Sequence, residues 1–209
     1  MTSEFSDIVR SEAELQHILG APSEKVVEKT LPALDRHCRA YIAKSPFILI
    51  ASCDKEGRMD VSPKGDPPGF VQVIDDVTLA IPERPGNRRA DTFHNVLQNP
   101  RVGLIFLIPG KKETLRVSGR AEIVRDAALR DTMAINGKAP ELALVLRVEE
   151  AFFHCAKCVV RSKLWSPDQW PSLEGLPTLA EAMIDAAKID LPEEALQAII
   201  DQDEKERLY

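Results

Sequence analysis

A short basic stretch, residues 84–89, carries three arginines and lies directly before a predicted helix. Asn87 is a good N-cap residue, and apolar side chains at helical spacing follow it. This pattern predicts a helix over residues 88–98, with Arg88 and Arg89 in its first turn. A helix N-terminus already carries partial positive charge and unpaired N–H groups, so two arginines there are electrostatically unfavourable.

An anion bound at this helix start would remove the mismatch. Backbone amides together with two guanidinium groups make a good phosphate site, so the sequence favours an anion cradle at residues 86–89. The alternative is that both arginines turn to solvent or pair with a carboxylate such as Glu83 or Asp91. Local chemistry leaves both interpretations open, because an exposed arginine in a first helical turn costs at most about 1 kcal/mol.

The composition argues against several classes of function. The 209 residues include 33 acidic and 27 basic side chains, so the net charge of −6 gives no general footprint for nucleic acid. No apolar run approaches the ~20 residues of a membrane span. The N-terminus also lacks the basic and then apolar pattern of a signal peptide. We therefore expect a cytoplasmic protein that binds neither nucleic acid nor membrane.

The order of predicted elements describes a mainly β protein with flanking helices. Residues 1–45 have helical patterns, and six strands with one short helix after the fourth follow in residues 46–125. Consecutive hairpins without strand–helix–strand alternation favour a six-stranded antiparallel barrel. Residues 126–209 hold a final strand near 141–153 and C-terminal helices. We expect residues 1–209 to form a single domain.

Two local features stand out within the predicted barrel. Residues 63–69 contain three prolines and two glycines, which predicts a rigid, irregular loop that forms a wall of a pocket. Gly119 interrupts a long alternating strand over residues 114–124. A glycine inside a strand indicates a β-bulge or a close approach of another backbone segment.

Four short motifs follow one another along the chain: Ser62-Pro63-Lys64, Gly86-Asn87-Arg88-Arg89, Asn99-Pro100-Arg101-Val102 and Thr114-Leu115-Arg116-Val117. In this order they resemble the pyridoxamine 5′-phosphate oxidase-related, FMN-binding split β-barrel proteins. The resemblance covers about residues 45–125. It implies a split barrel that forms a homodimer, with FMN bound in grooves at the subunit interface.

The resemblance also implies which residues bind the cofactor. Arg88 and Arg89 would hold the flavin phosphate, with Asn87 in the place of a serine in the family pattern. Ser62 and Lys64 would lie on the strand that runs beside the isoalloxazine ring and the ribityl chain.

Thr114 takes the place of a glutamine that faces the flavin in the family, and its side chain is shorter. Relatives that oxidise pyridoxamine phosphate carry a tryptophan followed by an arginine-containing element, whereas no such arginine follows Trp165 here. The resemblance therefore implies an FMN-dependent oxidoreductase that acts on an unknown small substrate. Its catalytic residues stay unassigned, because the flavin itself supplies the redox chemistry.

Other interpretations remain open beside this one. The alternatives are a non-catalytic flavin-binding or carrier protein, or the same fold with a deazaflavin or a haem. His154, Cys155 and Cys158 have the spacing of soft metal ligands, but the sequence offers no second Cys-x-x-Cys pair to complete a structural zinc site. We therefore predict no metal site and interpret the two cysteines as packed or incidental thiols.

Overall fold

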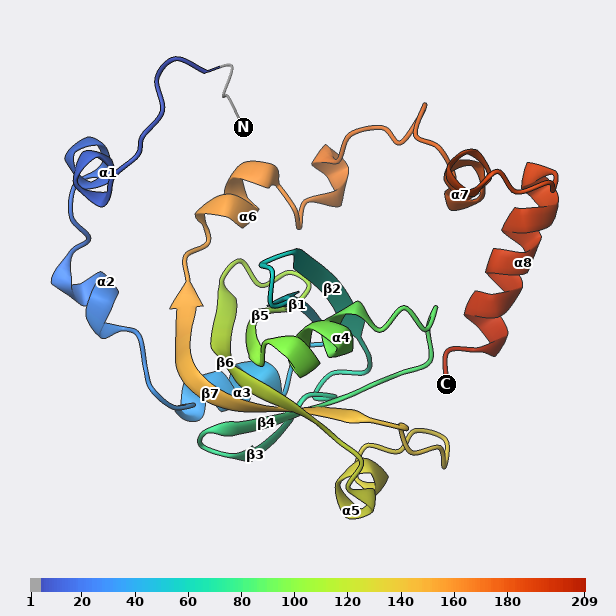
Figure 1. Ribbon diagram of the computed structural model, residues 1–209, viewed down its shortest axis with the longest axis horizontal. Coiled ribbons are helices and arrows are strands. Elements are labelled where there is room, and N and C mark those ends of the chain that lie inside the picture. Colours follow the sequence, from blue (N-terminus) through green and yellow to red (C-terminus); the bar gives the residue numbers. More distant parts are fainter. Residues whose placement is uncertain (1–4) are drawn as a thin grey trace.

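The computed structural model describes residues 5–209 and contains one antiparallel sheet of seven strands (Figure 1). The strands are β1 (Phe47–Cys53), β2 (Met59–Gly65), β3 (Gln72–Asp75), β4 (Thr78–Pro82), β5 (Arg101–Leu107), β6 (Thr114–Val124) and β7 (Ala143–His154). Their order in the sheet is β2-β1-β5-β6-β7-β4-β3. The sheet is not closed, so β2 and β3 are its edges. The predicted fold class is confirmed, and the final strand expected near residues 141–153 is β7, which joins the six predicted strands in one sheet.

An aspartate forms the turn in each of the hairpins β1–β2 and β3–β4. The Asp54 carboxylate accepts the N–H groups of Glu56 and Arg58, each at 2.9 Å, and Gly57 takes the left-handed conformation with φ 81°. This closes the β1–β2 hairpin, as predicted. In the β3–β4 hairpin, the Asp75 carboxylate accepts the N–H of Val77 at 2.8 Å.

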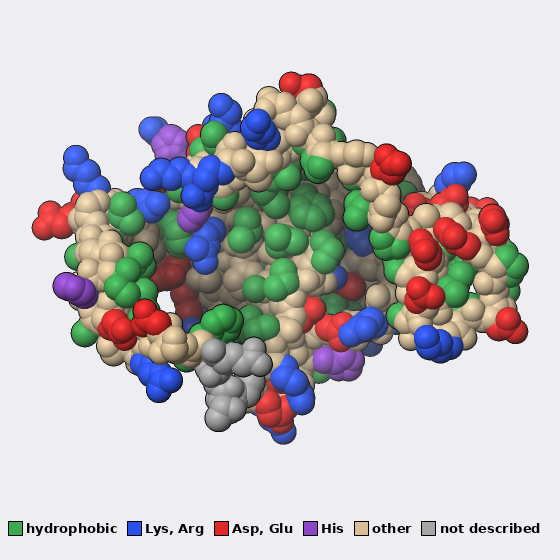
Figure 2. Space-filling view, turned by 90° about the horizontal axis from the view of Figure 1, so that it is seen from above, with side chains coloured by type: hydrophobic (Ala, Val, Ile, Leu, Met, Phe, Trp, Pro, Cys, Tyr) green, Lys and Arg blue, Asp and Glu red, His purple; other side chains and the backbone are tan. Residues whose placement is uncertain are grey.

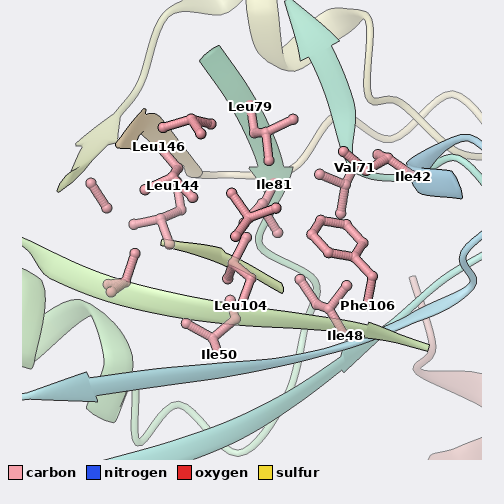
Figure 3. Close-up of a cluster of buried hydrophobic side chains, with 14 of the residues drawn as sticks. Ile42, Ile48, Ile50, Val71, Leu79, Ile81, Leu104, Phe106, Leu144 and Leu146 are labelled. Atoms are coloured by element: carbon pink, nitrogen blue, oxygen red, sulfur yellow. The ribbon is translucent and has the colours of Figure 1, made fainter. Parts of the chain in front are cut away.

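The hydrophobic core lies between the two halves of the curled sheet. Side chains from β1 and β5 point toward side chains from β4 and β7 (Figure 3). None of the following is more than 2% exposed: Ile48, Ile50, Leu104, Phe106, Leu79, Ile81, Leu144 and Leu146. Each side chain of this kind contributes about 1.5–3 kcal/mol when it leaves water, so this contact holds the two halves together.

The β6–β7 pair connects those halves and contains an irregularity at Gly119. Its register shifts between Ser118 and Gly119, and β7 turns through a wide bend in Figure 1. A Cβ atom at Gly119 would lie 1.9 Å from the carbonyl oxygen of Arg147. Both readings of this glycine, a bulge and a close approach, are therefore confirmed.

Nine short helices surround the sheet in the described part of the chain. They are α1 (Glu12–Leu19), α2 (Glu24–Glu28), α3 (Arg36–Ile42), α4 (Asp91–Gln98), α5 (Ala127–Asp131), α6 (Lys157–Ser162), the 3₁₀ helix η1 (Pro167–Gln169), α7 (Leu179–Ala187) and α8 (Glu193–Glu206). Helix α3 packs on the core through Cys38, Tyr41 and Ile42, and burial raises the pKa of the Cys38 thiol to about 11. Helices α1–α2 and α7–α8 extend on opposite sides of the sheet (Figure 1).

No helix within residues 5–209 is long and apolar enough to cross a membrane. The predicted helical region at the N-terminus begins at residue 1, and its residues 1–4 lie outside the described part. Helix α5 ends at Asp131, and the left-handed residues Asn136 and Gly137 then turn the chain toward β7.

One predicted boundary in the sheet is wrong. Residues 63–65 were expected in an irregular loop, but they continue β2 and pair with β1. Proline lacks a backbone donor and is tolerated on an edge strand, and β2 is an edge strand. Pro63 therefore does not end the strand.

We expect Gly119→Ala to lower the free energy of unfolding by about 2–3 kcal/mol, because the new methyl group overlaps a backbone carbonyl. Gly103→Ala in β5 is the matched control, since a Cβ there meets nothing within 4 Å; its effect should stay within about 0.5 kcal/mol. Urea unfolding followed by circular dichroism measures both values. Equal effects of the two substitutions would contradict the steric account of Gly119.

Candidate functional site

The candidate site lies between β2 and the loop of residues 83–90, which joins β4 to α4. Asp60, Ser62 and Lys64 alternate along β2 and therefore share one face of the strand. Lys64 Nζ lies 2.9 Å from a carboxylate oxygen of Glu83, and Thr92 Oγ1 donates to Asp60 at 3.2 Å. These contacts hold the loop and the start of α4 against β2.

A cavity of about 370 Å³ lies where the loop meets the strand. Ser62 and Lys64 line it from β2, and Asn87 and Arg88 line it from the loop. The structure thus brings together four of the six residues predicted to bind the cofactor. Arg89 is their neighbour in the loop but does not line the cavity, and Thr114 lies elsewhere.

The predicted helix start is wrong by three residues. Helix α4 begins at Asp91, and Ala90 precedes it in the left-handed conformation, with φ 53°. Asn87 does not cap the helix; its side-chain oxygen accepts the N–H of Arg89 at 3.0 Å within the loop. Asparagine forms such local turns as readily as helix caps. The first turn then contains Asp91, whose negative charge suits a helix N-terminus.

The two arginines of the predicted cradle have different surroundings. Arg89 Nε lies 2.8 Å from the Asp91 carboxylate, and this hydrogen bond raises the pKa of Arg89. Pairing with Asp91, which the sequence had left open, is thus found for Arg89. Arg88 makes no ion pair or side-chain hydrogen bond to any residue from 5 to 209. It is exposed and has a left-handed backbone, with φ 61°.

A buried ion pair anchors the beginning of the loop. Asp66, whose side chain is only 1% exposed, accepts a hydrogen bond from Arg84 Nε at 2.6 Å. Its other oxygen accepts the hydroxyl of Tyr209 at 2.6 Å. Arg84 also donates to the carbonyl of Met133 at 2.9 Å. The hydrogen bond to Asp66 raises the pKa of Tyr209, so this hydroxyl stays protonated at neutral pH.

Sequence reasoning missed Tyr209. The last residues are largely charged, a composition typical of a solvent-exposed segment. Tyr209 is 143 residues from Asp66 along the chain, and no local pattern announces a contact over that distance. A tyrosine beside charged residues was the only available signal, and it is weak.

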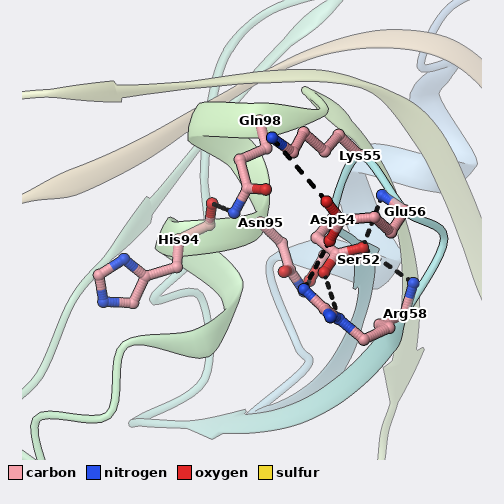
Figure 4. A network of polar contacts seen from close by, with 8 residues as sticks. All are labelled: Ser52, Asp54, Lys55, Glu56, Arg58, His94, Asn95 and Gln98. Carbon is pink, nitrogen blue, oxygen red and sulfur yellow. Dashed lines mark hydrogen bonds and ion pairs between the residues drawn. The ribbon is translucent and has the colours of Figure 1, made fainter.

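Helix α4 is fixed to β1 by polar contacts (Figure 4). Asn95 donates to Ser52 at 3.0 Å, next to the turn centred on Asp54. Burial alone would raise the pKa of Asp54, but hydrogen bonds from Arg58 and Glu56 outweigh it and lower the pKa below its ordinary value. The helix that follows the loop thus has a rigid support.

Thr114 stands apart from the other predicted site residues. It is 7% exposed and begins β6, opposite His154 of β7. Strands β1 and β5 separate β6 from β2, a distance on the order of 14 Å at normal strand spacing. Within one chain, Thr114 does not reach the cavity beside Ser62.

Cys155 and Cys158 are free and exposed, so core packing is wrong for them, whereas the alternative interpretation as incidental thiols is consistent with the structure. Cys155 lies just before α6, and Cys158 lies in its first turn. Among residues 5–209, no three His, Cys, Asp or Glu side chains are grouped in a way that would hold a metal ion.

Comparison with known proteins identifies a family. A family model described as pyridoxamine 5′-phosphate oxidase matches residues 34–155, which is more than half of the chain. No curated protein matches the chain. The matched residues run from just before α3 to the end of β7 and include all seven strands.

Solved structures with a similar fold have low sequence identity to the chain. HupZ of Group A Streptococcus is 19% identical with a TM-score of 0.48, over 59% of this chain and 95% of that one. A putative pyridoxamine 5′-phosphate oxidase from Lactobacillus delbrueckii is 20% identical with a TM-score of 0.47, over 58% and 95%. An FMN-binding protein from Syntrophomonas wolfei is 14% identical with a TM-score of 0.45, over 68% and 92%.

We expect Asp66→Asn to lower the free energy of unfolding by about 3 kcal/mol, because it leaves the partly buried Arg84 guanidinium without its counter-charge. Asp203→Asn is the matched control, since the Asp203–Arg207 pair on α8 is exposed; its effect should be below about 0.5 kcal/mol. Urea unfolding of both variants measures the difference. A small effect at both positions would show that the Asp66–Arg84 pair does not anchor the loop.

Proposed function

The chain belongs to the pyridoxamine 5′-phosphate oxidase family, and from this premise we propose that it is an FMN-binding flavoprotein with oxidoreductase activity on a small substrate. The observation that carries the proposal is Arg88. It is a cation without a partner in the described chain, and it lines a cavity together with Ser62 and Lys64. An unpaired guanidinium beside backbone N–H groups suits a phosphate.

The residues of the cavity fit the parts of FMN. Arg88 would bind the phosphate, with Asn87 and Arg89 beside it in the loop. Ser62 and Lys64 present a hydroxyl and an ammonium group along β2, where the hydroxyls and carbonyls of the ribityl chain and flavin ring would find donors. Glu83 holds Lys64 in place at 2.9 Å.

When bound, FMN supplies the redox chemistry, and the chain orients it. Lys64 is 24% exposed at its side chain, so it combines a fixed position with access to a ligand. We assign the Lys64–Glu83 ion pair to positioning the flavin in the cavity. The structure of the cavity gives no reason to assign a separate acid or base.

The lining of the cavity favours a flavin over a haem. Haem iron is normally held by His, Cys, Met or Tyr. None of these residues occurs among the described residues that line the 370 Å³ cavity. A phosphate-bearing flavin instead uses the groups that are present.

We propose that the protein acts as a homodimer, because the outer face of β1, β2 and β5 is apolar. Met59 and Val61 are 67% and 59% exposed on β2, and Leu49 and Ile105 are half-buried on the same side of the sheet. The outer face of a solvated antiparallel sheet is normally polar. Figure 2 shows a hollow in which hydrophobic side chains gather between two projecting lobes.

A second copy on this face would bring flavin-binding residues from both subunits together. Extended apolar patches of this kind mark interfaces. We assign Thr114 to the flavin site of the second subunit, since it cannot reach Ser62 of its own chain. The small substrate would bind against the exposed side of the flavin ring.

We expect the purified protein to show the absorbance spectrum of FMN, and Arg88→Ala to weaken FMN binding by about 10- to 100-fold, the value of a charge-assisted phosphate contact. Alanine is preferred to glycine here because it keeps the backbone preference of an L residue. Arg89→Ala should have a smaller effect, because Arg89 is paired with Asp91. Fluorescence titration with FMN measures each affinity.

Arg120→Ala is the control for this titration, since Arg120 is exposed on β6 outside the cavity. A colourless protein that ignores FMN would contradict the flavin assignment. Bound FMN that neither NADH nor NADPH reduces would instead point to a non-catalytic binding protein or to another electron donor.

We expect Val61→Glu to convert the dimer to a monomer, because it replaces an exposed apolar side chain of this face with a charge. Sedimentation velocity measures the change in mass. FMN affinity should fall in parallel, by about tenfold or more, if each flavin contacts two subunits. Lys55→Glu, in the exposed β1–β2 turn, is the control. A dimer that survives Val61→Glu would exclude this face as the interface.

A further inference from the structure

A second and larger cavity, of about 680 Å³, lies against the same loop. Residues 83–86 and Arg88 line both cavities, whereas Lys138, Leu142 and Tyr209 line only the larger one. Its size is typical of cavities that hold small organic molecules, and apolar residues form most of its wall. The flavin assignment makes no use of it.

Tyr209 forms a fixed wall of this cavity. Its hydroxyl donates to the buried Asp66 at 2.6 Å, and the Arg84 guanidinium lies 5.6 Å from the centre of its ring. Lys138 Nζ donates to the Tyr209 carbonyl at 2.9 Å. These three contacts come from three separate loops. The ring is therefore held in place, and the cavity is not a gap beside a loose tail.

The charges around the cavity leave a surplus of positive charge. Arg84 is neutralised by Asp66, and Glu83 is neutralised by Lys64. The remaining charged side chains in the lining are Arg88, Lys138 and Glu141. When no FMN phosphate is bound at Arg88, two cations stand against one carboxylate, which suits a ligand with a single negative charge.

Aromatic and apolar groups complete the lining. Phe93 of α4 is 8% exposed and contributes to the wall, together with Ala90 and Leu142. A flat ring would replace water at these surfaces and gain both area burial and ring contacts with Tyr209. Within residues 5–209 no group accepts a hydrogen bond from the Arg88 guanidinium, so its donors are available to a ligand when FMN is absent. Lys138 uses one of its three ammonium donors on Tyr209.

We propose that this cavity is a second small-molecule site and that it takes an aromatic carboxylate. The ring lies against Tyr209 and the apolar wall, and the carboxylate lies at the mouth with Arg88 and Lys138. The site goes beyond the flavin function and does not require bound FMN. Arg88 lines both cavities, and of the charged side chains that do so it is the one that the ion pairs with Asp66 and Lys64 leave free to contact a ligand in either site.

The test is isothermal titration of the full chain with 2-naphthoate, with and without saturating FMN. We expect binding, weakened about tenfold by Lys138→Ala and by Tyr209→Ala, the usual value of a charged or aromatic contact. Tyr209→Phe keeps the ring and should retain binding. Lys112→Ala, exposed in the β5–β6 turn outside both cavities, is the control and should bind 2-naphthoate as the unmodified protein does.

The proposal is overturned if the neutral 2-naphthylmethanol binds as tightly as 2-naphthoate, or if Lys138→Ala and Tyr209→Ala both leave the affinity unchanged. Lys138 is exposed, so its variant tests the site even if Tyr209→Ala unfolds. Binding of 2-naphthoate by a protein that ignores FMN would remove the flavin function and support this site. Binding of FMN but not of 2-naphthoate would support the flavin function and overturn the second site.

Discussion

The close approach of Gly119 to the backbone of Arg147 is the constraint on which the rest of the structure depends. It allows the two longest strands, β6 and β7, to bend together at a bulge. The bent β6–β7 pair connects β1 and β5 on one side of the sheet to β4 on the other, and the hydrophobic core forms between these two sides. A flat sheet of the same strands would separate these apolar faces and leave much of their surface in water, beyond the part that α3 and α4 cover.

The bend also creates the candidate site. β2 and β4 are far apart in the order of the sheet, yet the curl brings β2 against the loop that follows β4. No strand pairing joins them there. Side chains bridge them instead, through Lys64 with Glu83 and Arg84 with Asp66. Because side chains rather than backbone hydrogen bonds join β2 to the loop after β4, a cavity for a ligand remains between them. Strands paired by backbone hydrogen bonds would leave no such space.

Much of this arrangement was readable from the sequence, because short-range chemistry fixes it. Asp54 specifies a tight turn, Gly119 marks a bulge, and alternating residues predict the strands. The beginning of α4 was misjudged because Asn87 has two local uses, as a helix cap or within a turn, and only the surrounding structure decides between them. The contact of Tyr209 with Asp66 forms only when distant parts of the chain fold together. A pattern of neighbouring residues therefore cannot predict it.

The left-handed backbone of Arg88 and Ala90 has an evolutionary consequence. Each L residue in this conformation costs about 1 kcal/mol that glycine would not. Glycine at either position would thus favour the folded state locally, but at position 88 it would remove the cation. Selection for stability and selection for ligand binding oppose each other at this loop. Among related sequences, glycine in place of Arg88 would therefore mark lineages in which binding of the anion has been abandoned.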